Sequence, residues 1–163
     1  MSMVLPFQEI RRLVGTELGV SDWVLVDQHR INLFAEAADD FNQIHVDEGA
    51  AHAAGLPTTI AHGLLTISLL HRLAEPVVPR AAEMTGGFYY GFDKVRLIRP
   101  LLCGSQIRGR FHLLDYFERK PGQWMRVVSA RVEIMGDERP ALTAETRSVH
   151  FIPEHVSAAA GAA

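Results

Sequence analysis

The segment DDFNQIHVD, residues 39–47, carries residue types that could do chemistry. It lies between two stretches rich in apolar residues and contains Asp40, Asn42 and His45. A carboxylate can take a proton from water as a general base, and an imidazole can orient the same water. Asp40 and His45 are five residues apart across an expected helix end and loop. Their side chains could therefore converge on one water molecule, with Asn42 bracing the turn by hydrogen bonds.

The same segment also has a purely structural interpretation. Aspartates are common as helix N-caps and in solvated loops, and Asp39, Asp40 and Asp47 all suit such roles. From the spacing alone this interpretation is the stronger one, and Asp47 is assigned to capping. A chemical role for Asp40 therefore depends on a second motif elsewhere in the chain.

The second motif is Ala-His-Gly at residues 61–63. Gly63 opens a predicted helix, where free amides and the positive end of the helix dipole stabilise negative charge on an oxygen atom. Because glycine has no side chain, it also lets a ligand approach the backbone closely. We predict that His62 is a structural hydrogen-bonding residue and not a catalyst.

Three predicted helices position these motifs. Asp27 can cap the first, which ends just before the polar segment and has apolar residues at helical spacing: Ile31, Phe34, Ala35 and Ala38. Asp47 can cap a shorter helix over EGAAHAA, residues 48–54. The third, HGLLTISLLHRLAEP at residues 62–76, is apolar on most faces, as expected for a helix enclosed on most sides. A short N-terminal helix over residues 7–14 and a brief strand at residues 23–26 are also predicted.

Downstream of residue 104 the apolar spacing changes from helical to alternating. Residues 107–113 and 128–134 alternate, and KPGQ at 120–123 and GDERP at 136–140 supply turn residues. The sequence predicts an antiparallel meander of three long strands over residues 104–152, with a fourth strand at GFYYGFDKVRLI, residues 87–98. Such strands span roughly 40 Å and the enclosed helix about 20 Å. We therefore expect an α+β fold, with a long sheet curled around a central helix.

Length and composition predict a single domain without affinity for polyanions. The chain has 163 residues, 48% of them hydrophobic, and a net charge of −3, so it lacks the basic field that attracts nucleic acid or anionic membrane. Residues 1–153 are assigned to the domain and residues 154–163 to a disordered tail. The single cysteine, Cys103, excludes an intramolecular disulfide and fits a reducing compartment. With neither a secretory leader nor a membrane span expected, the predicted location is cytoplasmic.

Three segments together resemble a known family: FAEAADDFNQIHVD, TTIAHGLLTISLL and YGFDKVRLIRPLLCG. They are similar to the MaoC-like, (R)-specific enoyl-CoA hydratases of the hot-dog fold, in particular the NodN-like branch. The resemblance implies a homodimer with an active site near the subunit interface, an acyl-CoA thioester substrate, and neither a metal nor a redox cofactor. It implies that Asp40 and His45 are the catalytic pair and that the Gly63 amide is the oxyanion donor. Gln43 departs from the proline of many members.

The functional hypothesis is therefore reversible hydration of a trans-2-enoyl-CoA to the (R)-3-hydroxyacyl-CoA. An acyl-CoA thioesterase of the same fold is one alternative, but many of those enzymes carry a carboxylate on the central helix, and residues 64–74 contain none. A non-catalytic protein that binds acyl thioesters is the other alternative.

Further residues could contribute to substrate binding. Lys94, Arg96 and Arg99 could bind the CoA phosphates, although an alternating charged strand face predicts the same residues without a ligand. Leu64 and Leu65 could line an acyl tunnel, although core packing is the stronger default.

Two other sets have weaker support. A metal site built from His45, Asp47, His52 and His62 lacks HExxH or cysteine-rich spacing. Ser68 and His71, three residues apart on the enclosed helix, could imitate a nucleophile and its base. No G-x-S-x-G elbow surrounds the serine, so helix packing explains this pair better.

Overall fold

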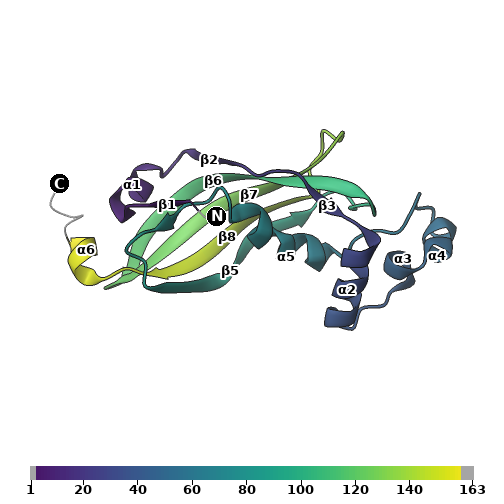
Figure 1. Cartoon of the computed structure of the whole chain (residues 1–163), viewed down its shortest axis with the longest axis horizontal. Helices are drawn as coiled ribbons and strands as arrows, with labels where there is room; N and C mark the ends of the chain where they lie inside the picture. The colour runs from purple at the N-terminus through teal and green to yellow at the C-terminus, as the bar shows by residue number, and fades with distance from the viewer. Residues whose placement is uncertain (1–2, 159–163) are drawn as a thin grey trace.

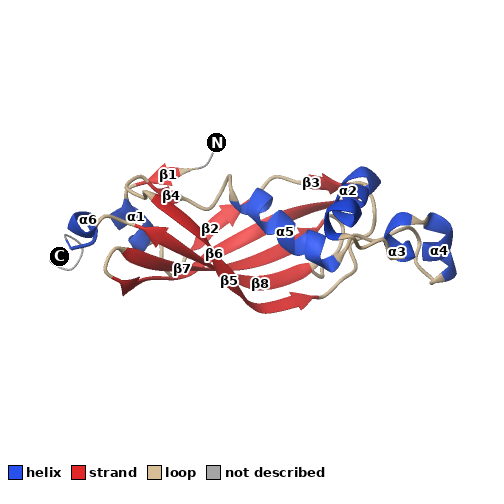
Figure 2. Ribbon diagram, turned by 90° about the horizontal axis from the view of Figure 1, so that it is seen from below, coloured by secondary structure: helices blue, strands red, loops and turns tan. Residues whose placement is uncertain are grey.

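The computed structural model describes residues 3–158. Helix α5 lies in the hollow of a curved sheet of six strands (Figures 1 and 2). The strand order is β2-β6-β7-β8-β5, and β3 also pairs with β6. All pairings in this sheet are antiparallel, whereas the short strands β1 and β4 pair in parallel outside it. The predicted α+β arrangement of a long antiparallel sheet around one helix is confirmed.

The bounds of the elements follow the chain order. The strands are β1 (Val4–Leu5), β2 (Glu17–Val20), β3 (Val24–Val26), β4 (Arg80–Ala81), β5 (Gly86–Leu97), β6 (Ser105–Lys120), β7 (Gln123–Ile134) and β8 (Leu142–Phe151). The helices are α1 (Phe7–Arg12), α2 (Gln28–Ala38), α3 (Gln43–Val46), α4 (Glu48–Ala53), α5 (Gly63–Ala74) and α6 (Glu154–Ala158). The meander of three long strands and the fourth strand before it match β6, β7, β8 and β5.

Helix α5 is held against the sheet by its leucines. Leu65, Leu69, Leu70 and Leu73 are buried in the main core cluster together with apolar side chains of β6 and β7. Burial of each such side chain stabilises the fold by about 1.5–3 kcal/mol. Gly109 in β6 permits the close approach, because a Cβ there would lie 3.0 Å from Leu73 Cβ. The predicted enclosure of this helix is confirmed on the face that carries the leucines.

Helices α2, α3 and α4 form a small lobe beyond one end of the sheet (Figure 1). Asp27 caps α2 by accepting a hydrogen bond from the Arg30 amide at 2.9 Å. Asp47 caps α4 by accepting from the Ala50 amide at 2.7 Å. Both predicted caps are confirmed. The single turn α3 was not predicted, because four residues are too few to show a helical period.

The C-terminal segment differs from its prediction where the structure describes it. Residues 154–158, assigned to a disordered tail, form helix α6. The Val156 amide donates a hydrogen bond to the Pro153 carbonyl at 2.9 Å, and the Val156 side chain packs against the core. This apolar contact orders the segment. Residues 159–163 of the predicted tail lie outside the described part of the chain.

Strand β5 is the edge of the sheet and is unusually apolar for an edge. It pairs with β8 on one side, and its exposed side chains include Phe88, Tyr89, Tyr90 and Phe92. A long, exposed edge strand is a ready template for pairing with another chain. Within residues 3–158, no helix is both long and apolar enough to cross a membrane.

Candidate active site

The polar segment begins where α2 ends. Asp39 terminates the helix in the left-handed conformation at φ 52°, and the Asp40 amide donates to the Ala35 carbonyl at 3.0 Å. Asn42 then caps α3, because its Oδ1 accepts from the Ile44 amide at 3.3 Å. Its own amide donates to Asp40 Oδ1 at 3.3 Å. Asn42 thus holds the turn between the carboxylate and α3, the supporting position predicted for it.

His45 is fixed by a hydrogen bond to the backbone. The residue is 9% exposed, and its Nδ1 lies 2.7 Å from the Ile60 carbonyl oxygen. A carbonyl oxygen can only accept, so Nδ1 carries the hydrogen and the neutral ring keeps a lone pair on Nε2. The Ile60 amide donates in return to the Ile44 carbonyl at 3.1 Å, which ties the strand-like segment before α5 to α3. His45 therefore presents a hydrogen-bond acceptor in a fixed orientation.

Two polar residues outside the motif support this arrangement. Gln28 Nε2 donates to the His45 carbonyl oxygen at 2.8 Å, and the Thr59 hydroxyl donates to Gln28 Oε1. Gln28 is the first residue of α2, and Thr59 precedes the Ala-His-Gly motif. No spacing rule indicates a pair 31 residues apart, so the sequence alone gave no sign of this support.

His62 joins the two motifs. Its Nε2 donates to the Asp40 carbonyl oxygen at 2.9 Å and lies 3.9 Å from the Asp40 carboxylate oxygen Oδ2. Its ring stacks on His45 with centroids 3.8 Å apart, and Phe34 packs beside it at 5.0 Å. The residue is buried, and its Nδ1 has no hydrogen-bond partner within the described chain. The hydrogen-bonding role expected for His62 is thus directed at Asp40 itself.

The two motifs bring three polar side chains into one cluster. One polar atom each from Asp40, His45 and His62 lies within 4.8 Å of the others. The Asp40 side chain is 52% exposed, whereas both histidines are buried. An exposed carboxylate beside a buried, oriented imidazole can hold a water molecule between them.

The same three side chains are the residues that could offer ligand atoms to a cation. The metal site considered from the sequence, with His45, Asp47, His52 and His62, is not the cluster that the structure forms. Asp47 Oδ1 caps α4, and His52 Nε2 lies 3.0 Å from the Pro57 carbonyl oxygen. The cluster contains Asp40 in place of these two residues.

Gly63 is the first residue of α5 and follows His62 directly. The first amides of a helix have no partner within the helix, so they can bind an oxygen atom. A Cβ at this position would lie 2.4 Å from Leu97 Cδ1 of β5. The absence of a side chain at Gly63 therefore allows Leu97 to pack against the first turn of α5.

The two leucines after Gly63 differ in their exposure to solvent. Leu65 is buried in the core, as predicted. Leu64 is 66% exposed, so the prediction that it packs in the core is wrong. The hollow on this side of the helix has a volume of about 460 Å³, and its wall is formed by other residues: Ile67, Ser68, Leu70, His71, Tyr89 and Phe92. Ser68 Oγ donates to the Leu65 carbonyl at 2.8 Å. Ser68 and His71 thus line a hollow, which adds to the helix packing predicted for them.

The basic residues of β5 and the following loop bond within the protein. Lys94 Nζ forms an ion pair with Glu145 of β8 at 2.6 Å, and Lys94 itself adopts a left-handed conformation at φ 50°, where the β5–β8 register shifts. Arg96 Nη1 donates to the adjacent Val95 carbonyl at 2.8 Å, and Arg99 pairs with Asp137 at 3.0 Å. These contacts are typical of a charged strand face, which was the alternative to CoA phosphate binding for these residues.

Comparisons with known proteins identify the family and agree with the fold. The chain belongs to the MaoC-like domain family, which matches residues 9–135. It is 43% identical to nodulation protein N of Rhizobium meliloti over 141 residues, covering 86% of this chain and 88% of that one. It is 36% identical to 3-hydroxyacyl-thioester dehydratase Z of Mycobacterium tuberculosis over 138 residues, covering 85% and 91%.

A solved structure shows the same fold. The (R)-hydratase from A. caviae involved in PHA biosynthesis superposes with a TM-score of 0.63 at 22% identity, over 80% of this chain and 96% of that one. The predicted family and the predicted hot-dog fold are both confirmed. The family places the protein among hydratases and dehydratases.

Proposed function

We propose that the protein catalyses the reversible, (R)-specific hydration of a trans-2-enoyl-CoA to the 3-hydroxyacyl-CoA. The observation that carries the proposal is the convergence of Asp40 and His45 with His62, within 4.8 Å of one another, where His62 directly precedes Gly63. It is supported by the family and by a relative named as a 3-hydroxyacyl-thioester dehydratase. The reaction uses the chain's own polar groups and needs no redox partner.

Each proposed role follows from the local chemistry. The Asp40 carboxylate takes a proton from the water, and the water oxygen bonds to C3 of the substrate. The electrons of the double bond shift towards the thioester oxygen, which accepts a hydrogen bond from the Gly63 amide at the positive end of α5. The proton on Asp40 then passes to C2, which completes the addition. His45 Nε2 accepts the second hydrogen of the water, because the Ile60 carbonyl fixes the proton on Nδ1.

Replacement of the proposed catalytic residues tests these roles. In Asp40→Asn and His45→Gln, the loss of crotonyl-CoA absorbance is expected to slow by about 100-fold or more, because the base or the water-orienting group is gone. His52→Gln is a matched control, since that histidine is bonded to the Pro57 carbonyl outside the cluster. Full activity of either variant would remove that residue from the mechanism, and chiral analysis of the product checks the (R) configuration.

The thioesterase remains the second candidate because the same fold presents a thioester to a helix N-terminus. No acidic side chain lies on α5, from Gly63 to Ala74, to act as its base. Release of free CoA thiol without hydration would favour this candidate. Thermal stabilisation by acyl-CoA without any turnover would favour the non-catalytic binding protein.

We further propose that two copies of the chain pair through β5. Exposed apolar side chains lie on this strand and beside the cluster, among them Phe41, Leu64, Tyr90, Phe92 and Leu97. A long edge strand with exposed apolar side chains is a template for pairing with another chain. A second copy would cover this surface and close the site at Gly63. Sedimentation of the wild-type chain is expected to give a dimer, and Phe92→Lys is expected to shift it towards the monomer.

A further inference from the structure

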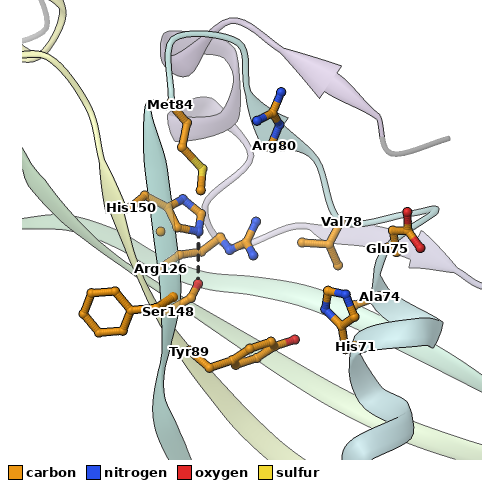
Figure 3. Close-up of a pocket in the computed structure, with 12 residues that line it drawn as sticks. His71, Ala74, Glu75, Val78, Arg80, Met84, Tyr89, Arg126, Ser148 and His150 are labelled. Carbon is orange, nitrogen blue, oxygen red and sulfur yellow. Dashed lines mark hydrogen bonds between the residues drawn. The ribbon is translucent and has the colours of Figure 1, made fainter.

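A half-buried arginine, Arg126, lies at the opposite end of α5 from Gly63. Arg126 of β7 pairs across the sheet with Tyr116 of β6 and Ser148 of β8, and Ser148 pairs in turn with Tyr89 of β5. Cross-strand partners share a face of the sheet, so these four residues form one polar row on the face that α5 covers. Figure 3 shows Arg126 pointing from this row towards the end of the helix.

Arg126 has few partners for a half-buried cation. Its Nη1 donates to the Pro79 carbonyl at 2.9 Å, and its Nε is shut off from solvent without an acceptor. Among the described residues it forms no ion pair, and burial lowers the pKa of its guanidinium. A buried charge without a counter-ion is destabilising, so an anion at this position would be bound strongly.

Tyr116, Ser148 and His150, which lie beside Arg126, do not supply the negative charge. The carboxylate of Glu83, which raises the pKa of Tyr116, accepts a hydrogen bond from the Phe7 amide at 2.9 Å and forms no ion pair with Arg126. His150 lies between the Tyr116 hydroxyl at 3.0 Å and the Ser148 hydroxyl at 3.1 Å, so both ring nitrogens are occupied. Burial and Arg126 lower the pKa of His150 to about 3, and burial raises the pKa of Tyr116. All three side chains are therefore neutral near pH 7. Glu75 also lines the cavity, but Figure 3 places its carboxylate on the far side from Arg126.

Arg126 borders a cavity with a volume of about 250 Å³. Its walls include the apolar side chains of Ala74, Val78 and Met84, and a second arginine, Arg80, lies at its edge (Figure 3). The cavity thus offers apolar surface together with the guanidinium groups of Arg126 and Arg80, with the Glu75 carboxylate on the side away from Arg126. A ligand with an apolar body and an anionic end matches this combination.

The cavity continues towards the proposed active site. It shares His71 and Tyr89 with the hollow of about 460 Å³ that also contains Ile67 and Ser68. Residues 67, 68, 71 and 74 lie on one face of α5, because they follow helical spacing. From Gly63 to Ala74 this face extends about 16 Å at 1.5 Å per residue. An extended acyl chain whose thioester lies at Gly63 would run along this face towards Arg126.

We propose that Arg126 binds a carboxylate at the end of the acyl chain remote from the thioester. The assignment rests on the proposed function, because it takes the thioester to lie at Gly63. A guanidinium presents its donors as a planar fork that a carboxylate can bridge with two hydrogen bonds. The substrates are then 2-enoyl thioesters that carry a terminal carboxylate, and Arg126 sets this specificity.

Binding of unreactive ligands tests the proposal without catalysis. Saturated acyl-CoA thioesters of four to twelve carbons are prepared in pairs that end in a methyl group or a carboxylate, and their dissociation constants are measured by calorimetry. At the chain length that reaches Arg126, the carboxylate is expected to bind about tenfold or more tightly than its methyl partner. Equal binding of both partners at every length would overturn the specificity and leave the hydratase proposal intact.

Two variants test whether the preference for a terminal carboxylate depends on Arg126. Arg126→Met, of similar volume, is expected to abolish the preference, and Arg131→Met on the opposite face of β7 is expected to retain it. The melting temperature reports whether Arg126→Met folds, which we expect because the change removes an unpaired, half-buried charge. A preference that survives in Arg126→Met would overturn the assignment. Failure of wild type to bind either ligand of any pair would overturn the proposed function and this inference together.

Discussion

The buried histidines at the two ends of helix α5 differ in how their ring nitrogens are hydrogen-bonded. At the N-terminal end, His45 and His62 each donate a hydrogen bond from one ring nitrogen to a main-chain carbonyl. Neither residue uses its second ring nitrogen in a hydrogen bond within the described chain. At the C-terminal end, His150 is bonded through both nitrogens, to Tyr116 and Ser148. A ring that keeps one nitrogen free can act on a water molecule. A ring with both nitrogens occupied, like that of His150, instead links β8 to β6 across β7.

The charged groups follow the same contrast. The Asp40 carboxylate at the N-terminal end is half exposed and can exchange protons with water. Arg126 at the C-terminal end lies beside the neutral side chains of Tyr116, Ser148 and His150, with its Nε shut off from solvent. One end is therefore suited to proton transfer and the other to charge recognition. The two proposals assign these two tasks to the two ends of one helix.

The largest effect is expected from removing the link between the two histidines and Asp40. In His62→Leu, the Asp40 carbonyl loses its donor and His45 loses the ring stacked on it. Small misplacement of a catalytic group costs about 100-fold in rate, so kcat is expected to fall by about this factor while KM changes little. Steady-state kinetics with crotonyl-CoA measures both constants. His52→Leu is the matched control, and equal rates for the two variants would show that His62 does not position Asp40.

A stability effect of intermediate size is expected at the other end. The pKa of His150, about 3 in the folded chain, lies below its ordinary value of 6.5. Below pH 6.5 the unfolded chain therefore binds a proton that the folded chain excludes. Stability from this group is complete above pH 6.5 and is lost as the pH falls towards 3. One proton corresponds to about 1.4 kcal/mol per pH unit, or about 2 kcal/mol at pH 5.

Urea unfolding of wild type and His150→Gln at pH 7 and pH 5 measures this loss. The variant lacks the titrating group, so its free energy of unfolding is expected to change by about 2 kcal/mol less between the two pH values. The other histidines are common to both proteins and cancel in the difference. An identical pH dependence of the two proteins would mean that folding does not lower the pKa of His150.

The smallest effect is expected at Gly63. In Gly63→Ala, the new methyl group meets Leu97 Cδ1, which belongs to an exposed side chain that can rotate away. Alanine favours a helix over glycine by about 1 kcal/mol, so the melting temperature is expected to hold or rise. The methyl group crowds the amide, and hydration is expected to slow about tenfold. If Leu97→Ala restores the rate in the double variant, Leu97 displacement and not access to the amide limits the reaction.

Much of the fold follows from local patterns in the sequence. Asp27 and Asp47 were identified as caps because an N-cap is a contact within one turn, and alternating residues in β6 and β7 show the period of a strand directly. The enclosed helix was recognisable from its leucines. Helix α6 was missed, because its order depends on packing of Val156 against the distant core.

The residues of the candidate site were predicted from the sequence, but the contacts between them were not. Asp40, Asn42, His45 and Gly63 stand in two short motifs, so their types and order were readable. The bond from His62 to the Asp40 carbonyl joins residues 22 positions apart, and no periodicity signals it. Leu64 was placed in the core because apolar residues surround it in the sequence, whereas it is exposed on the face where a second copy is proposed to bind.

The sequence by itself determined the secondary structure, the enclosed helix and the residues able to act on water, because caps, periods and motifs are contacts between near neighbours in the chain. Only the tertiary structure decided which of those side chains meet and which charge is left alone. Arg126 appears in the sequence as one arginine among several on alternating strands. Its lack of an ion pair arises from the pairing of β6, β7 and β8 under the end of α5, where the sheet shuts its Nε off from water and places it beside the neutral side chains of Tyr116 and Ser148.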